Sequence, residues 1–443
     1  MVTTLGRAVH RMRPLGGRHL RTFTSLTAAG LGEAVLPTLS LIALVRQTGS
    51  ETSGQVIFAQ SVATVWFLLC DPCLENAAQR FVPIEQRQSG RGSSLFVRLI
   101  RWDVAIGVAA ACAGLVVVLG AHLLGSLSRE FAAMFALAIV TRGAMASYGT
   151  AGAAFALTDR LRALGALRTR CAVLSFGLSL GGLFFGGPLL YLGGQAAGAL
   201  VTAVVFYLPA VRGILSQLGP AAARVRPPSG MIAFTVKTSA GTSVAGISDS
   251  GILALAGLLG GPALVTILKI ASSPGRFYAN LAIPVAAMLY PRIIRSATTG
   301  AGRAPIIRDI RRATLLLAAA GAVSIAVALP VIDAVIGIAY GPGYAHLGAV
   351  AVVLLGAACV KGTVCWSNVL PLALGRPGRR LAYLLAEGGM LVGSLLVGCR
   401  IASGPFHASL CFAWGSLAVA TLGAGFWIAS LRRVTDLGCP ERE

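Results

Sequence analysis

The chain has 443 residues, of which 56% are hydrophobic and only 12% are charged. Globular domains usually carry about 25% charged residues, so this composition excludes an ordinary soluble enzyme. The 55 glycines suit transmembrane helices, in which small residues let backbones approach closely. The formal net charge of +22 comes from short basic clusters between long apolar runs, which argues against nucleic-acid binding.

A transmembrane helix needs about 20 mostly apolar residues, and on this scale the sequence predicts twelve spans. They cover residues 22–45, 55–78, 102–125, 131–157, 170–187, 189–211, 232–259, 262–290, 313–338, 346–374, 381–402 and 406–431. Spans five and six are separated at Gly186-Gly187-Pro188, which is a strong turn signal. We interpret the first stretch as a span and not a signal peptide, because it is long and contains Glu33.

The loops indicate the topology. Thirty of the 37 Arg and Lys residues fall in alternate loops and the two terminal segments, whereas only Arg46, Arg129 and Arg400 fall in the opposite loops. The positive-inside rule then predicts that both termini are cytoplasmic. We therefore expect an all-α membrane protein with an N-terminal six-helix lobe (1–211), a cytoplasmic linker (212–231) and a C-terminal six-helix lobe (232–443), related as a parallel pseudo-repeat.

Four cations lie within the predicted spans: Arg142 in span four, Lys269 and Arg276 in span eight, and Lys361 in span ten. Placing a charge in hydrocarbon costs at least about 2.5 kcal/mol, so such residues usually face a partner or a wet cavity. Lys269 and Arg276 are two helical turns apart and share one face. These four residues are the candidate binding site for an anionic group such as a pyrophosphate; the alternative is that each pairs with an acid on a neighbouring helix.

Acidic residues also lie within the spans. Glu33 and Asp249 fall at comparable depths in the first helix of each half, where a carboxylate binds a coupling ion or neutralises a cation, and both roles stay open. Glu387 lies in span eleven. Asp71 and Glu75 are one turn apart before Arg80, which predicts a structural ion pair. No metal cluster or nucleotide-binding motif is apparent, so no cofactor is expected.

Five short motifs carry a family resemblance through their order and spacing. The chain resembles the polysaccharide exporter and O-antigen flippase family of the multidrug/oligosaccharidyl-lipid/polysaccharide superfamily. The motifs are Ala156-Leu157-Thr158-Asp159-Arg160-Leu161-Arg162, Leu259-Gly260-Gly261-Pro262-Ala263-Leu264-Val265, Ala286-Ala287-Met288-Leu289-Tyr290-Pro291-Arg292, Ala339-Tyr340-Gly341-Pro342-Gly343-Tyr344 and Leu372-Ala373-Leu374-Gly375-Arg376-Pro377.

The resemblance implies a transporter and not an enzyme. Its substrate would be an undecaprenyl-pyrophosphate-linked oligosaccharide, moved from the cytoplasmic to the outer face of the bacterial inner membrane for polysaccharide or lipopolysaccharide biosynthesis. Its partners would be membrane lipids, a polysaccharide polymerase and glycosyltransferases. An ion gradient would drive it, because the chain has no ATP-binding motif.

Four alternatives stay open. A multidrug and toxin extrusion antiporter shares the superfamily, but its cavity should be acidic and aromatic. The lipid II flippase usually has fourteen spans. A membrane-embedded polysaccharide-assembly enzyme usually has a large external loop or a soluble domain, and the longest loops here are short. A scaffold partner of the polysaccharide machinery is the fourth.

Overall fold

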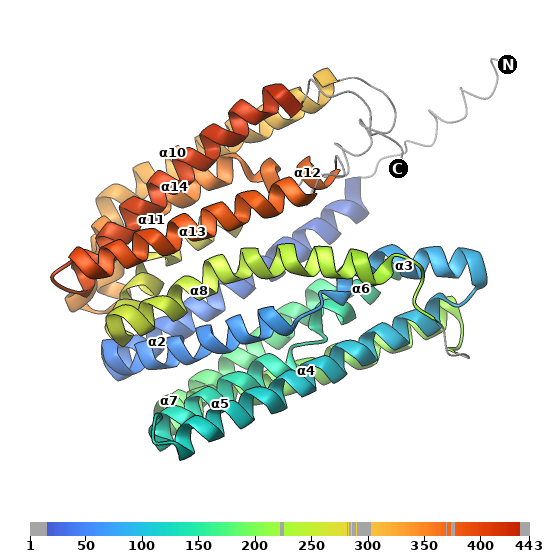
Figure 1. Cartoon of the computed structure of the whole chain (residues 1–443), viewed down its shortest axis with the longest axis horizontal. Coiled ribbons are helices and arrows are strands. Elements are labelled where there is room, and N and C mark those ends of the chain that lie inside the picture. Colours follow the sequence, from blue (N-terminus) through green and yellow to red (C-terminus); the bar gives the residue numbers. More distant parts are fainter. Residues whose placement is uncertain are drawn as a thin grey trace.

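The computed structural model describes residues 16–221, 226–280, 303–368, 370–373 and 377–434, together with 282, 285 and 289. Its elements are all helical and run roughly lengthwise through an elongated bundle (Figure 1). The α-helices are α2 (Gly16–Cys70), α3 (Leu74–Ser89), α4 (Gly92–Leu123), α5 (Arg129–Ala144), α6 (Tyr148–Leu157), α7 (Leu161–Leu218), α8 (Met231–Ala271), α10 (Arg303–Tyr340), α11 (Gly348–Thr363), α12 (Leu370–Ala373), α13 (Pro377–Ile401) and α14 (Pro405–Val434). Two short 3₁₀ helices, η1 (Pro342–Leu347) and η2 (Cys365–Asn368), flank α11.

Nine helical stretches in the described residues are long and apolar enough to cross a membrane. Three of the long helices contain glycines with non-helical backbone, at Gly49 in α2, at Gly186 and Gly187 in α7, and at Gly261 in α8. Each of these helices therefore contains the turn between two predicted spans. The count of twelve stays a prediction, because part of span eight lies outside the described residues.

The glycine turns are true reversals of the chain. A methyl group added at Gly182 would lie 2.0 Å from the Leu190 carbonyl oxygen, so the two arms of α7 lie against each other on either side of Gly187. Gly49 and Gly261 share one backbone conformation, with φ 76°, ψ −178° and φ 76°, ψ 177°. Only glycine adopts this region readily. The two halves of the chain thus make the same turn after their first helix.

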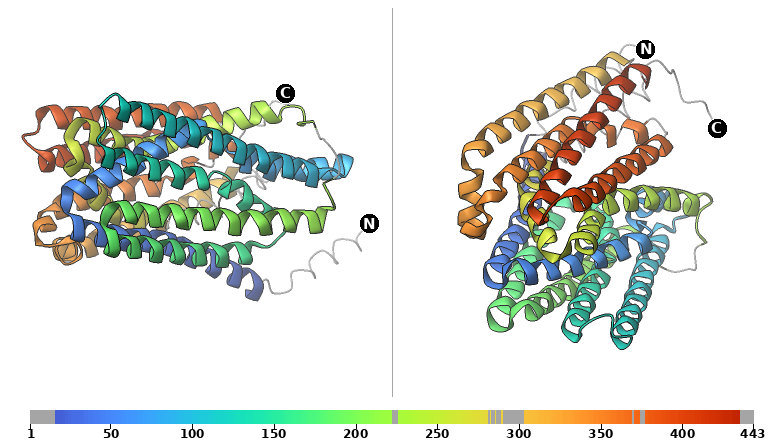
Figure 2. Two further views of the ribbon diagram at one scale, coloured as in Figure 1. Left: turned by 90° about the horizontal axis from the view of Figure 1, so that it is seen from below. Right: turned by 60° about the vertical axis from the view of Figure 1, so that its left-hand side comes forward.

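The helices form two groups, an N-terminal group (α2 to α7) and a C-terminal group (α8 to α14), seen below and above in Figure 1 and in the right view of Figure 2. The core of the N-terminal group packs side chains of α3, α4, α6 and α7, including Phe96, Phe155 and Phe206. Another core packs α8 against α11, α13 and α14. The groups meet where α2 lies against α8. The predicted lobe boundaries stay a prediction.

Figure 1 shows that the two groups converge at one end of the bundle and diverge toward the end where α2 begins and α14 ends. At the converged end, the second arm of α2 touches α8 through small residues. A methyl group added at Gly54 would lie 2.0 Å from the Pro262 carbonyl oxygen. The buried Thr266 hydroxyl donates to the Ser50 carbonyl oxygen at 2.7 Å, and its oxygen lies 3.2 Å from the Ser53 hydroxyl. We call these contacts between backbone and hydroxyl groups the α2–α8 seal.

The first half of α8 also packs on the N-terminal group. The Ser239 and Ser243 hydroxyls donate to the carbonyl oxygens of Asp71 and Leu68, each at 2.5 Å. The Arg80 guanidinium lies over the Phe234 ring, 4.6 Å from its centroid. Among the described residues no ion pair joins Arg80 to Asp71 or Glu75, so the predicted ion pair is replaced by a cation–π contact.

The seal makes a testable prediction for stability. We expect Gly54→Ala to destabilise the protein by about 1–3 kcal/mol, because the methyl group forces two backbones apart. The matched control is Gly120→Ala in α4, where no atom lies within 4 Å of the added carbon. Melting temperatures of the purified proteins in detergent measure both. Equal melting temperatures for the two variants would contradict close backbone contact at Gly54.

Candidate functional site

Three of the four predicted cations lie in the last turn of a helix that ends inside the bundle. Arg142 is in the last turn of α5, Lys269 in the last turn of α8 and Lys361 in the last turn of α11. The last carbonyl groups of a helix have no intrahelical partner and carry a partial negative charge. Each cation is therefore placed where the backbone itself favours positive charge.

Arg142 and Lys361 occupy equivalent places in the two groups. Both α5 and α11 have 16 residues, and each cation stands two residues before the end of its helix. A break follows in both: residues 145–147 form a turn before α6, and Val364 leads into the 3₁₀ helix η2. The repeat predicted from the loops thus extends to this pair of interior cations.

Lys269 precedes a break at Ser272. Pro274 has no N–H to donate to the carbonyl oxygen four residues earlier, so a regular helix cannot continue there. The Ser272 and Ser273 hydroxyls both donate to the Lys269 carbonyl oxygen, at 3.1 and 3.0 Å. The helix then resumes, and Arg276 follows within residues 273–280.

The four cations and two acids form one connected set, which we call the charge ladder. Lys269 interacts electrostatically with Arg142 on one side and with Arg276 on the other. Arg276 interacts with Asp249, and Asp249 with Lys361. The Lys361 ammonium nitrogen lies 2.8 Å from the Glu387 carboxylate oxygen. The ladder therefore runs from α5, across α8 and the segment after it, to α11 and α13.

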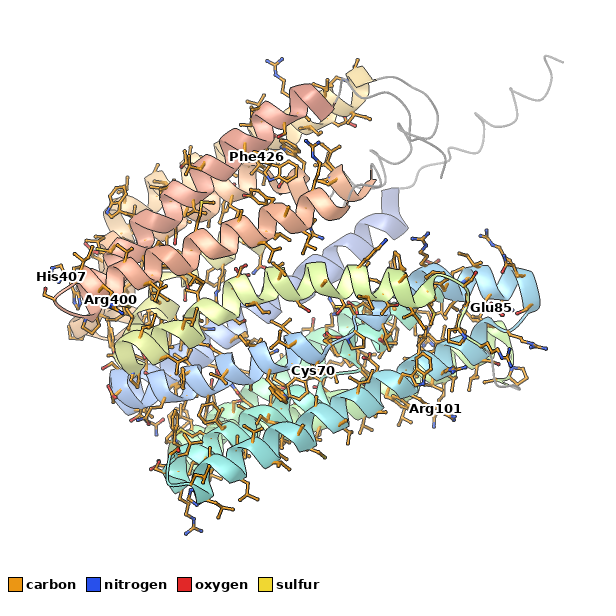
Figure 3. The ribbon with its side chains drawn as sticks, viewed as in Figure 1. Cys70, Glu85, Arg101, Arg400, His407 and Phe426 are labelled. Atoms are coloured by element: carbon orange, nitrogen blue, oxygen red, sulfur yellow. The ribbon has the colours of Figure 1, made fainter. Side chains whose placement is uncertain are left out.

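Charged residues lie both at the ends of the bundle and within it. Figure 3 places Glu85 and Arg101 toward the diverging end and Arg400 and His407 at the converged end. Four ladder residues are exposed (Arg142, Asp249, Arg276 and Lys361). Exposed charges on apolar helices would be costly against lipid, and these interact with one another across helices.

The ladder divides into an unpaired and a paired part. Within the described residues, neither Arg142 nor Lys269 has a carboxylate in electrostatic range. Arg276 and Lys361 each have one, Asp249 and Glu387. Among the described residues, no acid therefore balances Arg142 or Lys269, whereas Arg276 and Lys361 each interact with one acid. Whether the four cations bind an anionic group stays a prediction.

The structure describes the side chain of only one of the two predicted ion-coupling residues. Asp249 lies on α8 within the ladder, between two cations. Glu33 lies in α2, but its side chain is outside the described residues, so its role stays a prediction. Sequence reasoning noted Glu387 but did not select it. Its signal was available, since it is the acid within span eleven, but its partner could not be read from the chain.

Comparison of the sequence with protein-family models finds no match, and comparison with curated proteins finds no relative. Solved structures do match. An inward-facing multidrug resistance MATE family transporter of the MOP superfamily has a TM-score of 0.66 and 13% identity, over 93% of this chain and 100% of the other. The MATE transporter VcmN of Vibrio cholerae in its bent form also has a TM-score of 0.66, with 14% identity over 93% and 97%.

An outward-facing MATE family transporter has a TM-score of 0.61 and 12% identity, over 93% of this chain and 96% of the other. At such low identity the likeness establishes the fold alone. The chain therefore has the helical arrangement of MATE transporters over nearly its whole length. These structures are described as MATE transporters and not as O-antigen flippases, so they do not support the narrower resemblance seen in the sequence.

The ion pair of the ladder makes a prediction for stability. Lys361→Met leaves Glu387 buried without its partner, whereas Lys361→Met with Glu387→Gln removes both charges. We expect a coupling free energy of about 1–3 kcal/mol, with the double variant more stable than Lys361→Met alone. Thermal unfolding of the four proteins of the double-mutant cycle measures it. Additive effects of the two substitutions would show that the pair is not coupled.

Proposed function

We propose that this protein is an alternating-access membrane transporter whose cargo carries an anionic group. One observation carries the proposal: a MATE-like bundle holds two interior cations, Arg142 and Lys269, that no carboxylate neutralises in the described residues. Unpaired charge of one sign on apolar helices is costly to keep unless it serves a ligand of the other sign.

The shape of the bundle supports this mechanism. The two groups touch at the α2–α8 seal and diverge toward the opposite end (Figure 1). Rocking of one group against the other about the ladder would expose it to each side in turn. If the predicted topology holds, the diverging end is cytoplasmic and the cargo enters from there. Asp249, and Glu33 as predicted from the sequence, are the proposed coupling residues for an ion gradient.

The finer proposal is a lipid-linked oligosaccharide as cargo, with undecaprenyl pyrophosphate as its anchor. A pyrophosphate needs cations along a polar path, and Arg142 and Lys269 would supply them while the lipid tail stays in the bilayer. The proposed location is the bacterial inner membrane, and the proposed partners are a polysaccharide polymerase and glycosyltransferases. This cargo rests on the charge of the ladder and on the sequence motifs.

The second candidate is a multidrug and toxin extrusion antiporter, and the comparisons favour it over the oligosaccharide. The solved structures that share the fold are described as multidrug resistance or MATE transporters. Against it stands the charge of the ladder, because Arg142 and Lys269 would repel an organic cation. A drug that is neutral or anionic would satisfy both observations.

A variant series tests the anionic cargo. In proteoliposomes, we expect Arg142→Gln and Lys269→Met each to lower transport of a fluorescent undecaprenyl-pyrophosphate-linked sugar by about tenfold or more, the value of one charge-assisted contact. The matched control is Arg129→Gln, which removes an exposed arginine at the other end of the same helix, α5. Equal transport activity of all three variants would show that the ladder does not bind the cargo.

An experiment in cells distinguishes the oligosaccharide transporter from the multidrug antiporter. Deletion of the gene should cause lipid-linked oligosaccharides to accumulate while surface polysaccharide falls, and the native protein but not Lys269→Met should reverse both. Extracted lipids, separated by chromatography, provide the measurement. Unchanged lipid intermediates together with increased drug sensitivity would overturn the oligosaccharide cargo and establish the antiporter.

A further inference from the structure

Glu387 is the most enclosed charge of the ladder. Its side chain is 5% exposed, whereas the side chain of its partner Lys361 is 49% exposed. The ammonium group therefore contacts the carboxylate while the lysine side chain stays half exposed. Loss of the carboxylate charge would leave this cation accessible to another anion without any movement of its own helix.

The carboxylate is held in place by its surroundings. One turn before Glu387, the Tyr383 ring stacks on Phe426 with a centroid distance of 6.0 Å and packs edge-on against Trp427 at 5.3 Å. One residue after Glu387, Gly388 lies so close to α8 that an added carbon would be 2.8 Å from the Ser248 hydroxyl. The part of α13 that carries Glu387 is thus fixed between α14 and α8.

The N-terminal group shows what the same position looks like without this acid. Arg142 stands where Lys361 stands, two residues before the end of a 16-residue helix. In the described residues it has no carboxylate in range. The two groups therefore present equivalent cations, one open to an external anion and one occupied by an internal anion.

We propose that Glu387 is an internal counter-ion that occupies the anion site of Lys361 and so determines which cargo the transporter accepts. While the pair is intact, a cargo anion meets net positive charge only at Arg142 and Lys269. Without the negative charge of Glu387, Lys361 would be free to bind the anion. This inference deepens the proposed function and rests on it for the anionic cargo.

Three groups of the described residues interact with the pair or with one of its members: Asp249 on α8 with Lys361, Tyr383 on α13 with Glu387, and the two partners with each other. Asp249 is unsuitable as a control, because it also interacts with Arg276 and its removal would free that cation. The matched control is Glu130→Gln, which removes an exposed acid in the first turn of α5.

The test uses inorganic sulfate with the purified full-length protein in detergent. Calorimetry measures sulfate affinity for the native protein and for Glu387→Gln, Glu130→Gln, Lys361→Met and Lys361→Met with Glu387→Gln. We expect Glu387→Gln to bind sulfate about tenfold more tightly than the native protein, and more tightly than Glu130→Gln. The gain should disappear in the double variant.

Two outcomes overturn the inference. The first is a Glu387→Gln protein that binds no more tightly than the native one, with its melting temperature intact. If that variant melts early, a double variant that binds sulfate more weakly than the native protein overturns the inference instead, because Lys361 would then bind sulfate while it is paired with Glu387.

The same measurements distinguish failure of the proposed function from failure of this inference. Native binding that is lost in Arg142→Gln and Lys269→Met, with no gain in Glu387→Gln, supports the anionic cargo and removes the counter-ion. A gain in Glu387→Gln that depends on Lys361, without any native binding at Arg142 or Lys269, supports the counter-ion and removes the anionic cargo.

Discussion

A positive charge inside a lipid-embedded bundle needs a negative counterpart, and in this protein the ends of helices supply part of it. Arg142, Lys269 and Lys361 each lie in the last turn of a helix that stops partway through the bundle. The partial negative charge at a helix C-terminus favours a cation there, while local donors such as the Ser272 and Ser273 hydroxyls satisfy the carbonyl oxygen of Lys269. A helix break and a cation at the same place are therefore less costly in hydrocarbon than either would be alone.

The two groups of helices share this frame but differ in charge. Gly49 and Gly261 make the same turn, and α5 and α11 end in the same way. Yet Lys361 has Glu387 as a partner and Arg142 has no acid among the described residues. A shared backbone frame thus carries different charges in the two groups among the described residues.

Sequence reasoning recovered what depends on apolar length and on turn residues. It found the apolar spans, the reversal at Gly186 and Gly187, and the four interior cations. It missed the helix breaks at residues 145–147 and at Val364, because hydropathy averages measure apolar length and not backbone continuity. It also expected Arg80 to pair with Asp71 and Glu75, whereas the guanidinium lies over Phe234, which is distant in the chain and near only after folding.

The pairing within the ladder was beyond the sequence for the same reason. Lys361 and Glu387 lie on α11 and α13, and nothing in their spacing distinguishes a partner on a neighbouring helix from one facing the cavity. For Glu33 the sequence predicts a place in a helix, and the structure has the residue in α2. Its side chain lies outside the described residues, so no partner is assigned to it.

The α2–α8 seal has a mechanical consequence. Gly54 meets Pro262 through backbone atoms, so this part of the contact has no side chain that can rotate aside. A gate closed by a bulky side chain can leak through rotamer changes on the nanosecond scale. A gate closed by two backbones opens only when whole helices separate. Separation of the chain at Gly54 should therefore require movement of whole helices, whatever the neighbouring side chains do.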